Sequence, residues 1–175
     1  MKQYGTICYI NITLNSMVIY LASDHAGFDM KTAIWKAFED GFFGDGYALV
    51  DCGASLLKED DDYPEYMAKA SEKVAEDALH APSMAIIFGG SGTGEAIVAN
   101  RYPHVRAAVY QGGNIELVKL AREHNDANIL SIGARFATED QAKNAVMMFL
   151  TTPFSHDERH ERRILAIEEI SIPRA

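Results

Sequence analysis

The strongest chemical signal in the sequence is a glycine-rich segment that ends in a single acidic residue. An apolar run over residues 84–88 is followed by four glycines and then by Glu95. The glycines are Gly89, Gly90, Gly92 and Gly94. Glycines let backbone N–H groups point toward an oxygen that gains negative charge, and the start of a helix adds to this effect. A carboxylate beside such an anion hole can take a proton from carbon, so the segment predicts enolisation with Glu95 as the base.

The glycine spacing does not fit the common nucleotide-binding or nucleophile motifs. A dinucleotide-binding loop needs Gly-x-Gly-x-x-Gly, whereas the register that starts at Gly90 reaches Glu95. A P-loop would continue with Gly-Lys-Ser/Thr, and a nucleophile elbow at Ser91 would need glycine in place of Thr93. A tight turn between a strand and a helix needs only one or two glycines. The anion hole is therefore the hypothesis that accounts for the whole segment.

Two pairs of polar residues are further candidates for chemistry. Asp24 and His25 follow an apolar strand and could form an acid/base or hydroxyl-binding pair. The structural alternative for them is a capping aspartate beside a surface histidine. His124 and Asn125 close a predicted helix, where the alternative is a C-terminal cap with asparagine in the left-handed conformation.

Arginines in the second half of the chain predict a phosphate site. Arg159 and Arg163 are four residues apart and share one face of a predicted helix, and His160 lies on an adjacent face. Guanidinium groups match phosphate in geometry, although a solvated helix paired with nearby acids is the alternative. Arg135 follows the fifth predicted strand and strengthens the phosphate hypothesis, because it should lie on the ligand side of the sheet.

The spacing of apolar residues predicts the elements that position these side chains. The predicted strands are residues 17–22, 47–53, 84–90, 106–112 and 128–134, and the predicted helices are residues 23–40, 66–79, 95–101, 115–124, 138–150 and 155–170. This alternation is typical of an α/β fold, here a Rossmann-like three-layer sandwich with a five-stranded, mostly parallel sheet. Ligands bind beyond the carboxyl ends of such strands. The glycine-rich segment from Gly89 to Gly94, here called the glycine loop, should therefore lie close to Asp24, His25 and Arg135.

The two ends of the chain carry further predictions. A strong strand begins at Met17, so residues 1–16 are expected to form an N-terminal extension and residues 17–175 a single domain. The last predicted helix is followed by no strand. We expect this helix to reach toward a partner subunit.

Composition narrows the classes of partner and compartment. The chain has 175 residues and a formal net charge of −9, which argues against nucleic acid and anionic membranes as partners. No apolar stretch approaches the roughly 20 residues that a membrane span needs, and the N-terminal segment is a poor signal peptide. Cys8 and Cys52 lack metal-ligand spacing, so we expect reduced cysteines in a cytoplasmic protein.

Five motifs together resemble those of one known family. They are "ASDHAGFDMK" (22–31), "DYPEYMAKA" (62–70), "GGSGTGEAIVAN" (89–100), "LAREHNDANILSIGAR" (120–135) and "RHERR" (159–163). Across residues 17–170 the chain resembles the ribose-5-phosphate isomerase B / galactose-6-phosphate isomerase family, in the branch that uses a glutamate base. The resemblance implies aldose–ketose isomerisation of a sugar phosphate through ring opening and a cis-enediolate, with no metal or organic cofactor. It also implies homodimers or homotetramers in which two subunits build each active site.

The resemblance assigns roles residue by residue. Glu95 matches the base of the glutamate branch, and Gly89 stands where another branch has a catalytic cysteine. His124 matches the histidine that opens the sugar ring, with help from Asp24. Ser91 matches the residue that positions the sugar and the base. The other implied substrate contacts are His25, Gly90, Gly92, Thr93, Gly94, Asn125, Arg135, Arg159, His160 and Arg163.

The expected reaction is the interconversion of ribose 5-phosphate and ribulose 5-phosphate. One alternative is isomerisation of a tetrose 4-phosphate, allose 6-phosphate or galactose 6-phosphate, and another is a non-catalytic sugar-phosphate binding protein. The segment "YQGGNIEL" (110–117) is longer than is usual in the family and is expected near the sugar. It therefore bears on the choice of substrate.

Overall fold

Five parallel strands form a single sheet that helices cover on both faces. The computed structural model describes residues 16–170. The strands are β1 (Met17–Ser23), β2 (Tyr47–Asp51), β3 (Met84–Gly89), β4 (Ala107–Tyr110) and β5 (Ile129–Gly133). The α-helices are α1 (Phe28–Glu39), α2 (Tyr63–Asp77), α3 (Thr93–Ala99), α4 (Glu116–Asn125), α5 (Glu139–Thr151) and α6 (Glu158–Glu168), and the 3₁₀ turn η1 (His25–Gly27) precedes α1. The predicted α/β fold with a five-stranded sheet is confirmed.

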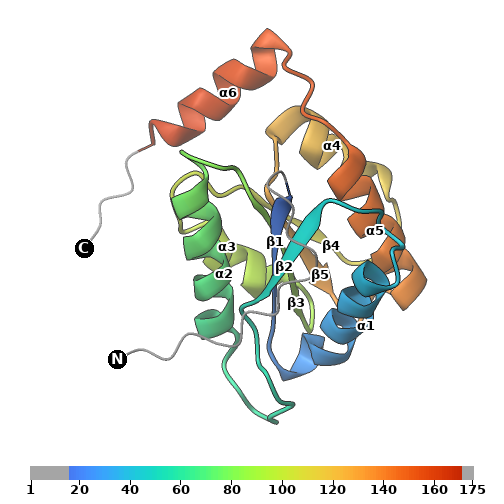
Figure 1. Ribbon diagram of the computed structural model, residues 1–175. Helices are drawn as coiled ribbons and strands as arrows, with labels where there is room; N and C mark the ends of the chain where they lie inside the picture. Colours follow the sequence, from blue (N-terminus) through green and yellow to red (C-terminus); the bar gives the residue numbers. More distant parts are fainter. Residues whose placement is uncertain (1–15, 171–175) are drawn as a thin grey trace.

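The helices form one layer on each face of the sheet, as Figure 1 shows. α1, α4 and α5 cover one face, where Ile34 and Phe149 lie in the same buried cluster as Phe88 of β3. α2 and α3 cover the opposite face, where Met67 packs in a cluster with Ile87. Successive residues of a strand point to opposite faces, so β3 contributes to both clusters. Full burial of a side chain of this size stabilises the fold by about 1.5–3 kcal/mol. The side chains of β3 therefore stabilise the packing on both faces of the sheet.

The strand order fixes where a ligand site can form. The order is β2-β1-β3-β5-β4, so the chain turns outward from β1 to β2 and then returns to place β3 on the other side of β1. In open parallel sheets, ligands bind beyond the carboxyl ends of the strands at such a switch point. The segments that follow β1 and β3 are Asp24 with η1 and the glycine loop.

Most predicted boundaries agree with the structure within a few residues, and the differences have local causes. β4 ends at Tyr110 rather than at residue 112, because Gly112 and Gly113 adopt positive φ angles that leave the strand conformation. α2 begins at Tyr63 rather than at residue 66. Pro64 lies in its first turn, where the missing N–H of proline removes no helical hydrogen bond.

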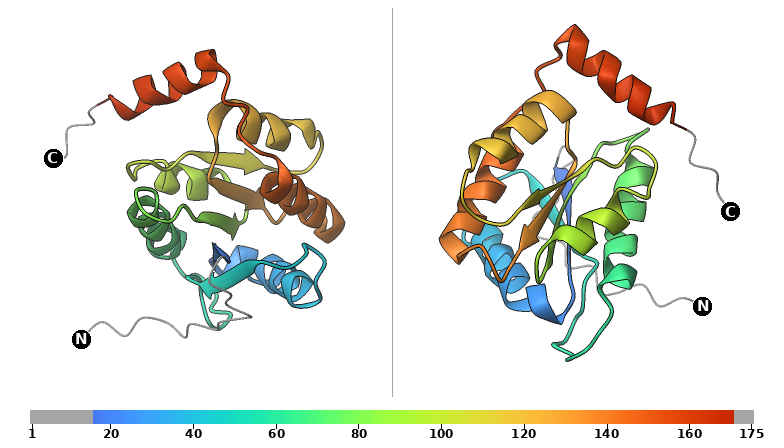
Figure 2. Two further views of the ribbon diagram at one scale, coloured as in Figure 1. Left: turned by 45° about the horizontal axis from the view of Figure 1, so that its top comes forward. Right: turned by 180° about the vertical axis from the view of Figure 1, so that it is seen from behind.

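α6 lies apart from both helical layers, as Figures 1 and 2 show. Near its start, the ring of His160 lies 4.3 Å from the ring of His124, between centroids, at the end of α4. Near its end, Glu168 lies 3.1 Å from Arg106 Nη1 and 3.0 Å from His104 Nδ1, just before β4. The helix therefore crosses the edge of the sheet at which β4 and β5 begin.

Some predictions concern the chain as a whole. Residues 1–15 of the predicted extension lie outside the described residues, and so does Cys8. None of the helices within residues 16–170 combines the length and the apolar character that crossing a bilayer requires.

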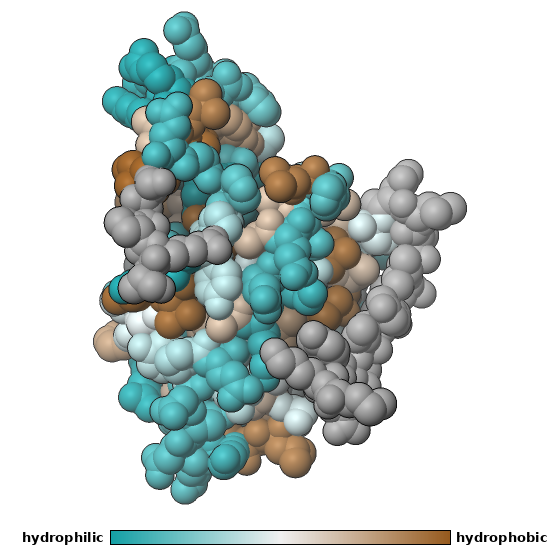
Figure 3. All heavy atoms as spheres, turned by 90° about the vertical axis from the view of Figure 1, so that its left-hand side faces the viewer, coloured by the Kyte–Doolittle hydropathy of each residue, from teal (hydrophilic) through white to brown (hydrophobic). Residues whose placement is uncertain are grey.

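Several large apolar side chains are exposed, among them Ile97 of α3, Val109 of β4 and Leu165 of α6. Figure 3 shows hydrophobic areas on the side of the molecule where α2 lies.

Candidate active site

Glu95 lies in the first turn of α3, directly after the glycine loop. It is 4% exposed, and its Oε2 atom has no hydrogen-bond partner among residues 16–170. Burial raises the pKa of Glu95, and the charge of Asp24 adds to the rise, while hydrogen bonds from the backbone N–H groups of Glu95 and Gly92 oppose it. A carboxylate with a raised pKa is a better proton acceptor than an exposed glutamate, which suits a general base.

Gly89 and Gly92 shape the loop around this carboxylate. A Cβ atom at Gly89 would overlap the carboxyl group of Glu95 and lie 2.8 Å from its Cγ, so only glycine leaves room. Gly92 has a φ of 76°, a left-handed conformation that glycine adopts without strain. A Cβ atom at Gly92 would also lie 3.0 Å from the backbone nitrogen of Gly133. The loop therefore packs closely against both Glu95 and the end of β5.

Hydrogen bonds attach the glycine loop to the segment after β5. The carbonyl groups of Gly89 and Gly90 accept from the N–H groups of Ala134 and Arg135, at 2.8 and 3.1 Å. The guanidinium carbon of Arg135 lies 3.4 Å from the position of a Cβ at Gly90, so the arginine covers the loop. The structure thus brings Arg135 to the glycine loop, as the carboxyl-end rule predicts.

Gln111 is a neighbour of the loop that sequence reasoning missed. Its Nε2 donates to the carbonyl of Ser91 at 2.8 Å and to Oγ1 of Thr93 at 3.2 Å. Ser91 Oγ in turn accepts from the N–H of Thr93 at 3.2 Å. The segment 110–117 therefore lies beside the glycine loop, and its glutamine braces the two residues at the loop's centre.

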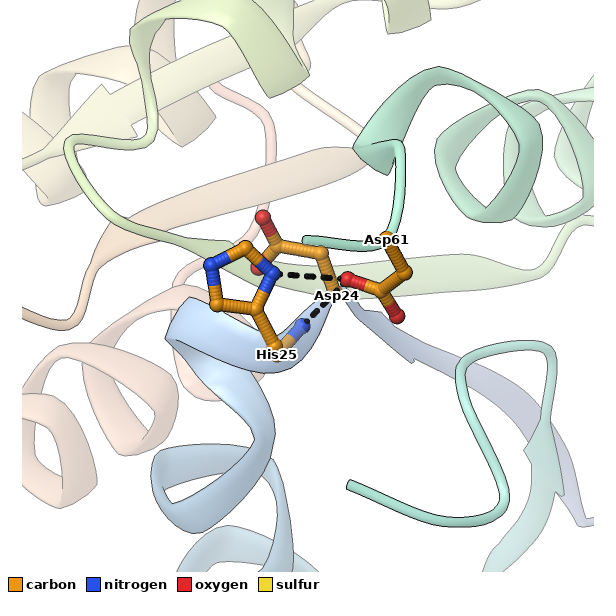
Figure 4. Close-up of side chains that lie close together, drawn as sticks. All are labelled: Asp24, His25 and Asp61. Atoms are coloured by element: carbon orange, nitrogen blue, oxygen red, sulfur yellow. Dashed lines mark hydrogen bonds and ion pairs between the residues drawn. The ribbon is translucent and has the colours of Figure 1, made fainter. Parts of the chain in front are cut away.

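Asp24 lies at the carboxyl end of β1, close to His25 and Asp61, as Figure 4 shows. Its Oδ1 accepts from the N–H of Gly27 at 3.1 Å and caps η1, so the capping alternative is correct for this oxygen. Asp24 is also 5% exposed and close enough for its charge to raise the pKa of Glu95. The aspartate therefore stabilises the local turn and belongs to the surroundings of the candidate base.

Asp61 contacts His25 twice through a single oxygen. Its Oδ1 accepts from the backbone N–H of His25 at 2.9 Å and lies 2.8 Å from the ring Nδ1. The hydrogen bond to Asp61 raises the pKa of His25. Burial acts to raise the pKa of Asp61, but hydrogen bonds from His25 and Tyr66, together with the charge of His25, hold that pKa below its ordinary value. Asp24, His25 and Asp61 each offer one ligand-type atom within 4.8 Å of the others, and the His25–Asp61 ion pair explains why the histidine and Asp61 approach so closely.

The other predicted residues lie at the opposite edge of the sheet. His124 and Asn125 end α4, just before β5 begins. The carbonyl of Asn125 accepts from Nε of Arg106 at 2.9 Å, just before β4 begins. The structural alternative of a left-handed asparagine cap does not apply, because Asp126 adopts that conformation with a φ of 44° and Asn125 stays in the helix.

His160 packs against His124 and is almost fully buried. The two rings are tilted by 40°, and His160 is 2% exposed. Its Nδ1 lies 2.9 Å from Oγ of Ser155. Burial lowers the pKa of His160, and the neighbouring His124 and Arg159 lower it further, while Asp157 opposes the shift. His160 therefore forms a buried support for the His124 ring.

The site residues form two groups within one chain. The carboxyl-edge group consists of Asp24, His25, Asp61, the glycine loop with Ser91 and Thr93, Glu95 and Arg135. The amino-edge group consists of His124, Asn125, Arg159, His160 and Arg163. Strands rise about 3.3 Å per residue, so β5 alone separates the two edges by roughly 13 Å. Within residues 16–170, no carboxylate lies within 4 Å of Arg135, Arg159 or Arg163, so all three guanidinium groups are free of ion pairs there.

Comparisons of the sequence with known proteins agree on one family. The model of the Ribose/Galactose Isomerase family matches residues 19–167. A protein of Mycolicibacterium paratuberculosis named ribose-5-phosphate isomerase B is 41% identical over 153 residues, which cover 87% of this chain and 91% of the relative. A protein of the same name from Mycobacterium tuberculosis is 38% identical over 156 residues, which cover 89% of this chain and 91% of the relative.

Solved structures agree with this assignment. The type B ribose 5-phosphate isomerase of Trypanosoma cruzi matches with a TM-score of 0.79 and 31% identity, over 87% of this chain and 95% of that one. Ribose-5-phosphate isomerase B from Mycoplasma genitalium, solved with bound ribulose-5-phosphate, matches with a TM-score of 0.78, 31% identity and the same coverage. The predicted resemblance is therefore confirmed, and the chain belongs to the Ribose/Galactose Isomerase family.

Proposed function

We propose that this protein interconverts ribose 5-phosphate and ribulose 5-phosphate, with Glu95 as the base. The observation that carries the proposal is the buried Oε2 atom of Glu95, which has no hydrogen-bond partner among the described residues and lies against a glycine loop. A protein that only binds a sugar phosphate needs arginines, but it does not need a carboxylate with a raised pKa in its interior. The substrate follows from the relatives, which are named ribose-5-phosphate isomerase B.

The proposed chemistry starts from the open-chain sugar. Glu95 takes the proton from C2 of the aldose, the C–H electron pair forms a double bond between C1 and C2, and O1 becomes negatively charged. N–H groups of the glycine loop stabilise this oxyanion. Glu95 then returns the proton to C1, while the proton on O2 moves to O1 and the C2 carbonyl forms. Every atom of the aldose is retained in the ketose, and the steps use only groups of the protein and the sugar.

We further propose that two subunits complete each active site. One chain holds the base at one edge of its sheet and the candidate ring-opening histidine, His124, at the other. An isolated chain therefore contains no complete active site. In a homodimer or homotetramer, α6 would bring the amino-edge group to the carboxyl-edge group of a partner, and Arg159 and Arg163 would bind the phosphate together with Arg135. The exposed Leu165 and Ile167 of α6 support this arrangement, because apolar side chains of this size are commonly buried at interfaces.

The compartment and the domain limits belong to the same proposal. We place the enzyme in the cytoplasm, where sugar phosphates are metabolised and where cysteines such as Cys52 stay reduced. Residues 17–175 form its single domain. The protein has a formal net charge of −9, and phosphorylated sugars are negatively charged as well. Binding such a sugar therefore requires a local basic site, which Arg135, Arg159 and Arg163 would supply.

Kinetics on a panel of sugar phosphates test the proposal. We expect kcat/KM for ribose 5-phosphate to exceed that for erythrulose 4-phosphate, allose 6-phosphate and galactose 6-phosphate by about tenfold or more. A maximum at another sugar would reassign the substrate. Deuterium exchange at C2 in heavy water provides the second reading, because a binding protein would neither turn over nor exchange the C2 proton of any sugar in the panel.

A further inference from the structure

Asp61 is a buried carboxylate to which the proposed reaction assigns no role. It lies in the loop between β2 and α2, its side chain is 4% exposed, and its Oδ2 atom has no hydrogen-bond partner within residues 16–170. Its neighbours in the acidic run, Asp60 and Asp62, are exposed. Removing a carboxylate from water is unfavourable unless a partner compensates for the lost hydration. The partner that Asp61 contacts therefore indicates what this residue does.

That partner is His25, and the contact fixes both the backbone and the ring. One oxygen of Asp61 accepts from the His25 N–H at 2.9 Å and lies 2.8 Å from Nδ1. Nε2 lies on the far side of the ring from Asp61, as Figure 4 shows. The His25 side chain is 29% exposed, so a ligand can reach the ring. Asp61 thus determines which ring nitrogen a ligand meets.

The protonation state decides what Nε2 can do. When Nδ1–H donates to Asp61, a neutral ring has only a lone pair at Nε2, which a phosphate oxygen would repel. A protonated ring keeps the hydrogen bond to Asp61 and also carries a hydrogen on Nε2, which can donate to phosphate.

We propose that Asp61 is a positioning residue that keeps the His25 ring oriented and protonated, so that Nε2 donates to the phosphate of the substrate. This inference rests on the proposed function, because it needs a phosphorylated substrate. The other charges near the ring act in the same direction, since Asp24 and Asp60 also favour the protonated form, while burial opposes it. A hydrogen bond from the Tyr66 side chain of α2 also lowers the pKa of Asp61.

The test compares Asp61→Asn with Asp60→Asn, two variants that each remove one negative charge from the same loop. Asp60 has a φ of 62°, which asparagine also tolerates, so the control preserves the backbone. NMR titration of the His25 ring in the free protein should give a wild-type pKa above the ordinary histidine value. Asp61→Asn should lower that pKa clearly, and Asp60→Asn should change it little.

Kinetics and phosphate binding provide the second readout. At about pH 8, Asp61→Asn should raise KM for the sugar phosphate, and Kd for inorganic phosphate, on the order of tenfold, with a smaller change in kcat. Near about pH 5.5 the His25 ring should be largely protonated in the wild type and in Asp61→Asn alike. The difference in KM and Kd between the two proteins should then shrink to about twofold. Asp60→Asn should stay within about twofold of the wild type at both pH values.

Three results would overturn the inference. First, a wild-type His25 pKa at or below the ordinary histidine value would show, without any variant, that Asp61 does not keep the ring protonated. An equal effect of Asp61→Asn at both pH values would mean that Asp61 only supports the loop. An effect of Asp60→Asn as large as that of Asp61→Asn would mean that only the overall charge matters. If the wild type isomerises no sugar phosphate, the proposed function fails by itself, and the His25 titration still decides whether Asp61 controls the ring.

Discussion

The carboxyl group of Glu95 occupies the space into which a side chain at Gly89 would project. A Cβ atom at residue 89 would overlap this carboxyl group and lie 2.8 Å from the Cγ of Glu95. A carboxylate at residue 95 in this position and a side chain at residue 89 are therefore mutually exclusive. The family resemblance places a catalytic cysteine at residue 89 in another branch. This geometry is consistent with the proposed glutamate base, because a chain that holds a carboxylate here has no room for that cysteine.

This relationship predicts that Gly89→Ala folds but loses most of its activity. The atoms that the new Cβ would meet belong to the flexible end of Glu95, which can rotate away while β3 stays in place. Displacing a general base lowers the rate by about 10²–10⁴-fold. Circular dichroism should show an unchanged fold, and steady-state kinetics should show the loss in kcat. As a control, Gly89→Ala in a Glu95→Gln background should add less than about threefold, and a full additional loss there would argue against this explanation.

The raised pKa of Glu95 predicts the position of the acid limb of the rate profile. The base must be ionised, so kcat/KM should fall as the pH drops through the pKa of Glu95. Burial raises that pKa above the ordinary value of 4.5, so the midpoint should lie above 4.5. Asp24→Asn removes a charge that adds to the rise, and the midpoint of its residual activity should move to lower pH. A wild-type midpoint at or below 4.5 would be incompatible with a buried glutamate base.

The same pKa shift predicts that the candidate base destabilises the fold at neutral pH. The pKa of Glu95 is higher in the folded state than in the unfolded state. The resulting penalty is therefore fully present above the folded pKa and disappears as the pH falls below the unfolded pKa. Glu95→Gln should raise the unfolding temperature near about pH 8, and this gain should vanish near about pH 4. Thermal unfolding followed by circular dichroism measures both, and an unchanged or lower unfolding temperature at the higher pH would speak against the burial penalty.

The separation of Glu95 and His124 within one chain predicts complementation between subunits. Mixed dimers of Glu95→Gln and His124→Ala protein contain one site with both residues intact and one site with neither. After random exchange of equal amounts, about a quarter of the wild-type activity should return. Native mass spectrometry of one isotope-labelled variant verifies the exchange. If mixed dimers form and activity stays at the level of the separate variants, each site belongs to a single subunit.

The sequence predicted which residues meet at the carboxyl edge of the sheet, because simple rules of strand order and glycine spacing apply there. Glycine spacing pointed to Glu95, and the strand-end rule brought Asp24, His25 and Arg135 to the same edge. Asp61 escaped prediction because it stands in an acidic run that is typical of a solvated loop. Only the path of that loop from β2 to α2 turns this one carboxylate inward.

The remaining differences also follow from geometry that residue types do not encode. α4 runs back from the carboxyl edge to the amino edge, so its last residues, His124 and Asn125, end far from Glu95. The family motifs identify these residues without showing that one chain holds them apart. Gln111 was missed because the predicted strand 106–112 includes it, whereas β4 ends at Tyr110 and leaves Gln111 at the carboxyl edge, and because an amide has no distinctive spacing.

Proton exchange at C2 of the sugar in Glu95→Gln protein tests the central claim most directly. The variant should fold, bind inorganic phosphate within about twofold of the wild type, and exchange the C2 proton of ribose 5-phosphate with heavy water on the order of 10²–10⁴-fold more slowly. That result would identify Glu95 as the group that moves the proton. Exchange that stays within about tenfold of the wild-type rate would show that a group other than Glu95 is the base.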